Sequence, residues 1–242
     1  MQPILVELPQ SPWSEKARWA LDHHRVRYHS VEHVPLVYEP LLRLASREAR
    51  RKPTVPMLFD GNLVVRDSFA IARHVDQHGS GDKLIPSEHD AEITRWNDRV
   101  EELMQNARAR VVQRIPSSTA ALRDELPSFL RPFGRVLTPV ARLGLGFVAH
   151  KFDTASVASA PSEAAMASVL ESAQAAIARG PYLVGNRFTF ADVALACGVD
   201  FVAPHPRSAH SPAGREVWCE PKLAAAFPDV VAWRDRIIER HR

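Results

Sequence analysis

The stretch ILVELPQSPWSEKARWAL, residues 4–21, decides the fold of the N-terminal part of the chain. It begins in a β-branched and apolar run from Pro3 to Leu8, which predicts a strand, and Pro9 and Pro12 prevent that strand from continuing. After the prolines the residues recur at helical spacing, with one apolar and one charged face. This predicts an amphipathic helix of about three turns. The apolar face holds Trp13, Ala17, Ala20, Leu21 and His24, and the charged face holds Glu15, Lys16, Arg18 and Asp22.

A second strand is predicted soon after this helix. It covers Val26 to Val31, so strand, helix and strand fit into about thirty residues, the size of a βαβ unit. A weaker helical pattern follows around Leu41 to Arg50. This first part of the chain therefore predicts two parallel strands with helices between and after them.

Antiparallel strands and another helix complete this half. In TVPMLFDGNLVV, residues 54–65, two apolar runs flank the Asp-Gly pair at 60–61, which tolerates positive φ and suits a hairpin turn. RDSFAIARHVDQH, residues 66–78, then resumes helical spacing, and Asp67 or Ser68 can cap its first turn. The predicted order is βαβ, a weak helix, then ββα.

Three short motifs in this order resemble the thioredoxin-fold N-terminal domain of cytosolic glutathione transferases. They occur at the end of the first strand, at the start of the third strand and at the start of the third helix. The resemblance implies an α/β thioredoxin-like domain followed by an all-α domain, the glutathione S-transferase fold, in its serine type. The motifs are Ser11-Pro12-x-Ser14, Val55-Pro56 and Asp67-Ser68.

The glycine-rich segment HGSGDKLIP, residues 78–86, predicts a boundary between a domain over 1–80 and a helical domain over 86–242. EITRWNDRVEELMQNARARVVQRI, residues 92–115, has apolar side chains at three-to-four spacing and predicts a helix of roughly six turns. Kinked or broken helices are expected over Leu122 to Phe152, because prolines interrupt that region. These prolines are Pro127, Pro132 and Pro139.

Two further segments in the second half resemble the same family. GPYLVGNRFTFADVALACGVDF, residues 180–201, contains the Thr-x-x-Asp that recurs at the start of a buried helix. Thr189 and Asp192 can exchange backbone and side-chain hydrogen bonds as a capping box, so we assign them a structural role. Cys197 is expected to be a small core residue, and FPDVVAWRDRIIERHR, residues 227–242, is similar to the family's last helix.

A serine at the start of the first helix suits an anion. The unpaired N–H groups there carry a partial positive charge, which favours a thiolate. The resemblance assigns the contact with the glutathione thiolate to Ser11, with Ser14 as the competing residue. The alternative is a purely structural role, in which Ser11 only caps the helix. Since serine cannot form a mixed disulfide, conjugation is favoured over thiol–disulfide exchange.

The resemblance also implies the remaining glutathione contacts. The backbone of Val55, before a cis Pro56, would pair with the cysteinyl group, and Asp67 with Ser68 would hold the γ-glutamyl end. Thr54 stands where many members have Lys or Gln, so the contact from this position is shorter or lost. Trp13 is expected either to line the mouth of the electrophile pocket or to pack in the core.

Composition excludes other classes of protein. The chain has 31 basic and 28 acidic residues, and its densest basic cluster, Arg47 to Lys52, contains Glu48 and no aromatic residue, which does not favour nucleic acid. Two cysteines favour a reducing cytoplasm, and no apolar run reaches the ~18 residues of a membrane span. His205 and His210, among prolines, are expected in a surface loop without a metal.

The hypothesis from the sequence is a cytoplasmic, homodimeric glutathione transferase. Its glutathione thiolate would attack a hydrophobic electrophile bound by the helical domain, without a metal, a membrane or nucleic acid. One alternative is a non-catalytic binding protein that holds a ligand or a protein partner. Another is a different reaction of bound glutathione, as in a peroxidase, a dehalogenase or an ether-cleaving enzyme.

Overall fold

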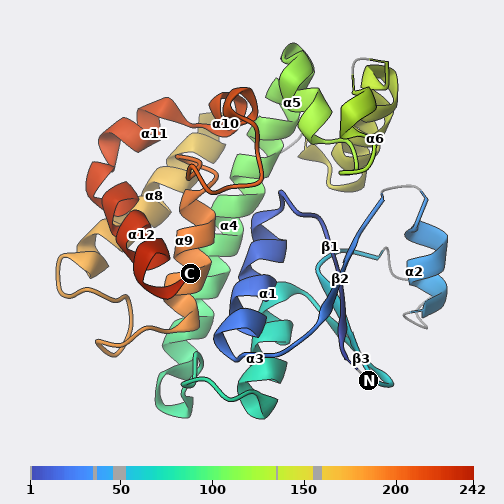
Figure 1. Ribbon diagram of the computed structural model, residues 1–242. Helices are drawn as coiled ribbons and strands as arrows, with labels where there is room; N and C mark the ends of the chain where they lie inside the picture. Colours follow the sequence, from blue (N-terminus) through green and yellow to red (C-terminus); the bar gives the residue numbers. More distant parts are fainter. Residues whose placement is uncertain (1, 35–36, 46–52, 135, 155–159) are drawn as a thin grey trace.

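The computed structural model describes residues 2–34, 37–45, 53–134, 136–154 and 160–242 of the chain. A small mixed sheet with its own helices forms the N-terminal part, and the rest of the described chain is helical (Figure 1). The long helix α4 (Asp90–Arg114) runs through the middle of the helical part. None of the described helices is both long enough and apolar enough to cross a membrane.

The sheet has four strands in the order β2-β1-β3-β4. β1 pairs with β2 in parallel and β3 with β4 antiparallel, as the sequence predicts. The antiparallel pairing of β1 with β3 was not predicted. A two-residue turn joins β3 to β4, and its first residue, Gly61, has φ +59°. The elements are β1 (Ile4–Glu7), α1 (Pro12–His23), β2 (His29–Glu32), α2 (Glu39–Ala45), β3 (Met57–Asp60), β4 (Leu63–Arg66) and α3 (Ser68–His78).

Alternation along the strands gives the sheet two covered faces. Leu5 and Leu58 belong to the large core that includes α1 and α3. Their neighbours Val6 and Met57 belong to a second, smaller core with Leu42 of α2. Because successive side chains of a strand point to opposite faces, four-residue strands are sufficient to join both layers. α1 follows directly after β1, a central strand of the sheet, so its N-terminus lies at the end of a strand that is packed on both faces.

The helical part is built around α9 (Phe190–Val199), every residue of which is buried. α9 contacts α4, α1 and α12, so it joins the two parts of the molecule. A helix that is apolar all round is stable only in such a position. The other α-helices of this part are α5 (Thr119–Asp124), α6 (Thr138–Lys151), α8 (Ala160–Ile177), α10 (Pro212–Trp218), α11 (Pro221–Ala226) and α12 (Pro228–His241), and short 3-10 helices cover Ser87–His89, Ile115–Ser117 and Arg131–Phe133.

Two predicted elements differ in their bounds. The second strand begins at His29 and not at Val26, because the Val26 amide still donates to Leu21 O at the end of α1 and Arg25 takes φ 56° there. The helix expected around Leu41 to Arg50 is found as Glu39–Ala45. Residues 46–52, which contain the rest of that prediction and the basic cluster, lie outside the described residues.

The prolines of the helical part act differently from the prediction at one position. Pro139 does not interrupt a helix but lies in the first turn of α6, where a backbone N–H has no helical acceptor. Pro132 lies in the short 3-10 helix before α6, and Pro127 precedes it in a turn. α4 is also longer than predicted, because it begins at Asp90.

Candidate active site

Ser11 is the N-cap residue of α1, with φ −80° and ψ 123°. Its carbonyl accepts the Glu15 N–H at 3.0 Å, and Pro12 occupies the first turn, where it needs no acceptor. The Ser11 side chain, however, makes no capping hydrogen bond. The hydroxyl is therefore not used to complete the helix, in contrast to the purely capping role that the sequence left open.

Ser14 has a different environment. It is fully buried, and its Oγ accepts the Leu8 N–H at 3.1 Å. This bond ties the end of β1 to the first turn of α1. Ser14 does not line the cavity described next, whereas Ser11 does.

A cavity of about 600 Å³ lies between the sheet part and the helical part. Its volume is in the range typical of small-molecule sites. The structure brings together in its wall all the residues that the resemblance assigned to glutathione, and Trp13 as well. They are Ser11, Thr54, Val55, Pro56, Asp67 and Ser68.

The backbone at this wall has two special features. The Val55–Pro56 peptide bond is cis, as the family resemblance implied. Asp67 has φ 60° and ψ 155°, a backbone conformation that is costly for any residue other than glycine. Its carboxylate accepts the Ala70 N–H at 2.8 Å and caps α3, and Ser68 follows it with only 1% of its surface exposed.

A polar link joins α1 to α4 at the other side of the cavity. The sequence places Lys16 on the charged, solvent-facing side of its helix, and this prediction was wrong because Lys16 is fully buried. Its Nζ donates to Asn97 Oδ1 at 2.9 Å and to Glu101 Oε1 at 2.6 Å. The indole N–H of Trp13 donates to the other Glu101 oxygen at 2.6 Å. The sequence of α1 alone does not predict this link, because the acceptors of Lys16 lie more than 80 residues away in the chain.

Sequence models of two known domains match the chain. Residues 5–83 match "Glutathione S-transferase, N-terminal domain", and residues 142–241 match "Glutathione S-transferase, C-terminal domain". The chain belongs to the glutathione S-transferase superfamily. No curated protein sequence matches it significantly.

Solved glutathione S-transferases have the same fold as this chain. A glutathione S-transferase from Methylobacterium radiotolerans, in complex with glutathione sulfonate, is 16% identical with a TM-score of 0.61, over 99% of this chain and 92% of its own. One from Methylobacillus flagellatus with glutathione bound is 14% identical, with a TM-score of 0.60 over 99% and 96%. Glutathione transferase F7 from Populus trichocarpa is 18% identical, with a TM-score of 0.59 over 98% and 94%.

Several further residues of the chain line the cavity, and the sequence did not predict them there. Arg108 of α4 and Phe152, just after α6, face the same space as Trp13. Lys151 forms an ion pair with Glu39 of α2 and donates to Pro53 O at 2.6 Å. These residues belong to segments that are far apart in the sequence. The spacing within each segment does not predict that their side chains line one cavity.

Two titratable groups of the cavity have shifted pKa values. Burial, together with the nearby Lys151 ammonium, lowers the pKa of His33 to about 4, so its imidazole is neutral at neutral pH. Burial raises the pKa of Glu125 to about 7, against a smaller opposing effect of the Gln10 side chain. These groups make the cavity wall less charged than its composition indicates.

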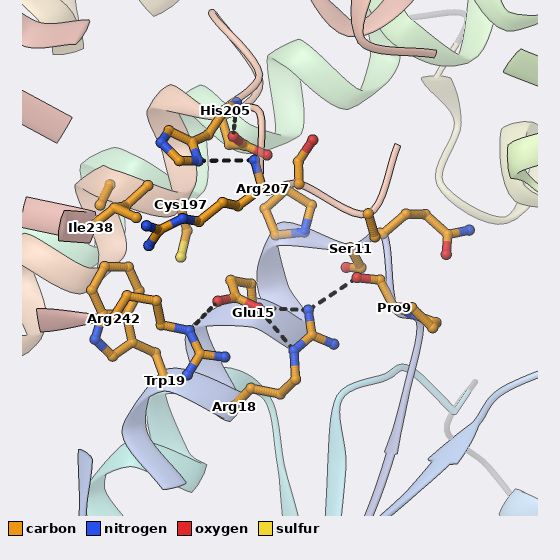
Figure 2. Close-up of a pocket in the computed structure, with 16 residues that line it drawn as sticks. Pro9, Ser11, Glu15, Arg18, Trp19, Cys197, His205, Arg207, Ile238 and Arg242 are labelled. Carbon is orange, nitrogen blue, oxygen red and sulfur yellow. Dashed lines mark hydrogen bonds and ion pairs between the residues drawn. The ribbon is translucent and has the colours of Figure 1, made fainter. Parts of the chain in front are cut away.

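A second cavity of about 330 Å³ shares Gln10, Ser11 and Pro12 with the first, so the start of α1 forms a wall between the two. Figure 2 shows this second cavity, with the Cys197 sulfur pointing into it. Cys197 is buried, as predicted, and burial raises the pKa of its thiol well above the ordinary value. Such a thiol is a poor nucleophile.

Ion pairs at this second cavity hold α1 in place. Arg18 pairs with Glu15 and donates to Pro9 O at 3.0 Å (Figure 2). It also pairs with Glu7 of β1. Glu15 also accepts a hydrogen bond from Arg242 Nε at 2.7 Å (Figure 2). Arg242 therefore helps to hold α1, the helix that begins directly after Ser11.

The loop around His205 and His210 is only partly at the surface. His210 is buried and packs against the Trp218 ring, which corrects the prediction of a surface residue. Neither of its ring nitrogens has a hydrogen-bond partner among the residues that the structure describes. The Trp218 contact lies eight residues ahead, which the proline-rich pattern does not reveal. In the part of the chain that the structure describes, no three His, Cys, Asp or Glu side chains gather as metal ligands.

The segment before α9 holds the pair to which we assigned a capping role. The Thr189 N–H donates to Asp192 Oδ2 at 2.8 Å, and the same carboxylate accepts the Leu183 N–H at 2.9 Å. The Thr189 hydroxyl also lies 3.1 Å from Asp192 Oδ2. Both side chains are fully buried and line neither cavity.

Proposed function

We propose that this protein is a glutathione transferase in which Ser11 stabilises the glutathione thiolate for attack on an electrophilic small molecule. The observation that carries the proposal is the position of Ser11. Its hydroxyl makes no capping bond, it lies at the N-terminus of α1, and it lines the same cavity as Val55, Asp67 and Ser68.

The energy required is within reach of these groups. A free thiol such as that of glutathione has a pKa near ~8.5, and lowering it by about two units requires roughly 2.7 kcal/mol of differential stabilisation. A hydrogen bond from a hydroxyl to an anion contributes about 1.5 to 3 kcal/mol. The partial positive charge at the N-terminus of α1 adds about 0.3 to 1 kcal/mol. The two together are sufficient to keep the thiol ionised at neutral pH.

Each remaining contact follows the chemistry of the tripeptide. The backbone of Val55 would pair with the cysteinyl residue, and Asp67 would hold the γ-glutamyl ammonium. The Ser68 hydroxyl and the N-terminus of α3 would hold the γ-glutamyl carboxylate. Thr54 is too short to replace a lysine or glutamine, so this position adds little to the affinity.

The location and the oligomeric state are part of the proposal. We propose a cytoplasmic homodimer, on the family resemblance and on the two free cysteines, Cys197 and Cys219. Light scattering of the purified protein measures the oligomeric state. A monomer at all working concentrations would contradict the dimer without affecting the site.

Steady-state kinetics test the proposed activity. The rate of loss of an activated aryl halide is measured with glutathione and, as a control, with free cysteine at the same thiolate concentration. The proposal predicts saturation with glutathione and none with cysteine. Glutathione binding without turnover of any aryl halide, epoxide, peroxide or α,β-unsaturated carbonyl would contradict it and favour the non-catalytic alternative.

A further inference from the structure

The guanidinium of Arg108 contacts two aromatic rings in the wall of the larger cavity. Its central carbon lies 4.8 Å from the centroid of the Trp13 ring and 3.9 Å from that of Phe152. Trp13 belongs to α1 and Phe152 follows directly after α6, so two separate segments hold the guanidinium by cation–π contacts. Arg108 is therefore a positioned cation and not a flexible surface side chain.

Arg108 has no carboxylate partner among the residues that the structure describes. No ion pair is formed by its guanidinium within those residues, and its Nε is buried without a hydrogen-bond partner. The carboxylate that acts on it electrostatically is Glu101, which is already bonded to Lys16 and Trp13. Burial lowers the pKa of Arg108 to about 10, so it is still a cation at neutral pH.

The other acidic groups near this half of the cavity do not supply the missing charge. Glu39 is paired with Lys151. Within the described part of the chain, Glu125 forms no ion pair with Arg108, and burial raises the pKa of its carboxyl to about 7, which reduces its negative charge at neutral pH. Buried charges are normally paired, because an unpaired one loses its hydration without compensation. Arg108 therefore lacks a counterion that a ligand can supply.

The geometry points to Arg108 as the residue that selects an electrophile carrying a carboxylate on a flat, conjugated body. This inference rests on the proposed function, because it names the substrate class of the same site. Trp13 and Phe152 offer apolar faces to the body of such a molecule, and the guanidinium offers two parallel N–H donors to its carboxylate. A purely apolar electrophile would leave the cation unpaired.

A matched pair of electrophiles tests this preference. They are 4-chloro-3,5-dinitrobenzoate and 4-chloro-3,5-dinitrobenzamide, which differ in the charge of one substituent. In both, the glutathione sulfur forms a bond to the ring carbon, and the C–Cl bond breaks with its electron pair leaving as chloride. Each kcat/KM is divided by the rate constant of the uncatalysed reaction with glutathione, because the two rings differ in reactivity.

The expected result is a preference of the wild-type protein for the benzoate. Arg108→Gln should lower the benzoate-to-benzamide ratio by about tenfold or more, the effect of losing a hydrogen-bonded charge. Arg108→Lys should retain part of the preference, because lysine keeps the positive charge but lacks the two parallel N–H donors of the guanidinium. Arg99→Gln is the matched control, since Arg99 is an exposed arginine of the same helix outside the cavity, and it should leave the ratio unchanged.

Three results would overturn the inference. One is an equal loss for both electrophiles in Arg108→Gln, which would make Arg108 a structural residue. Another is a rise in the KM for glutathione alone, which would assign Arg108 to a carboxylate of glutathione itself. The third is a wild-type ratio that already equals that of Arg108→Gln.

Binding of the reaction products separates this inference from the proposed function. If no electrophile is turned over, the proposed activity fails, but the two S-aryl glutathione products can still be titrated calorimetrically. Tighter binding of the carboxylate product by the wild type, lost in Arg108→Gln, would support the inference alone. Equal affinity for the two products would contradict it.

Discussion

The indole N–H of Trp13 lies 2.6 Å from Glu101 Oε2, although the two residues are 88 positions apart in the sequence. The other oxygen of Glu101 accepts from the buried Lys16. One carboxylate of α4 thus holds two residues of the first turns of α1, Trp13 and Lys16, close to Ser11 in the sequence. The same Glu101 carboxylate therefore holds Trp13 in the cavity wall by a hydrogen bond and Lys16 of α1 by an ion pair.

Glu101→Gln should destabilise the protein, because it leaves the Lys16 ammonium buried without a counterion. Breaking a buried pair costs about 3 to 5 kcal/mol, and since Glu101 is partly exposed we expect a value near ~3 kcal/mol. Urea denaturation measures it. Glu102→Gln, at the exposed neighbouring position, is the control and should have little effect. Equal stability of the two variants would contradict the role of the pair.

Ser14→Ala and Ser11→Ala should differ in stability. Removal of the Ser14 hydroxyl leaves the Leu8 N–H without its acceptor and should cost about 1 kcal/mol or more. Ser11 makes no capping bond, so its removal should change the free energy of unfolding by less than about 0.5 kcal/mol. Urea denaturation of both variants checks this, and a larger loss for Ser11→Ala would show that the hydroxyl has a structural role.

Asp192→Ala should be strongly destabilising, because two buried backbone donors, Leu183 N–H and Thr189 N–H, lose their acceptor. An unsatisfied buried donor costs about 1 to 3 kcal/mol, so the loss should exceed about 2 kcal/mol. Since Asp192 lines neither cavity, the activity of the remaining folded molecules should be unchanged. Comparison of denaturation midpoints with active-site-titrated rates tests both statements. A selective loss of turnover without a loss of stability would assign Asp192 to the chemistry.

Stability should fall in acid because of His210. Burial lowers its pKa to about 4; the Asp124 carboxylate opposes this effect, and the arginines Arg131 and Arg215 add to it. The unfolded chain binds this proton near pH ~6.5, so stability is full above that pH and is lost as the pH falls toward 4. The loss approaches roughly 3 kcal/mol at the lower end.

Denaturation of His210→Phe between about pH 7 and pH 5 tests this linkage. The variant should show a smaller decrease than the wild type, though not none, because the pKa of His33 is also lowered to about 4. His29→Gln, at an exposed position, should keep the wild-type decrease. The same pH dependence in all of these proteins would exclude His210 as its source.

Local patterns in the sequence predicted the sheet part well. Alternating and helical spacing identified β1, α1 and the β3–β4 hairpin, because each depends on residues that are neighbours in the chain. The order β2-β1-β3-β4 within the sheet was not predicted and became visible only in the structure. Errors arose at ends of elements, as at Val26, where a single residue with positive φ delays the next strand.

Residues buried by distant segments could not be predicted in this way. Trp19 lies on neither face that the spacing distinguishes, yet it is buried and donates to His241 O at 3.1 Å, 222 residues away. Lys16 was placed on the charged face of its helix because the residues that bury it, on α4, are also distant in the sequence. Arg108 looks like any helix-surface arginine until Trp13 and Phe152 are placed around it. The residues that the family resemblance assigned to glutathione were named from the sequence and line one cavity, whereas the position of Arg108 in its wall became visible only in the tertiary structure.

The pKa of glutathione bound to the protein tests the central claim most directly. Ultraviolet absorbance of the thiolate is followed from about pH 5 to about pH 9 in the wild type and in Ser11→Ala, with glutathione saturating in both. We predict a wild-type pKa about two units below the ~8.5 of a free thiol, and a return toward that value in Ser11→Ala. An unshifted pKa in the wild type, or the same lowered pKa in both proteins, would contradict the assignment of Ser11 to the thiolate.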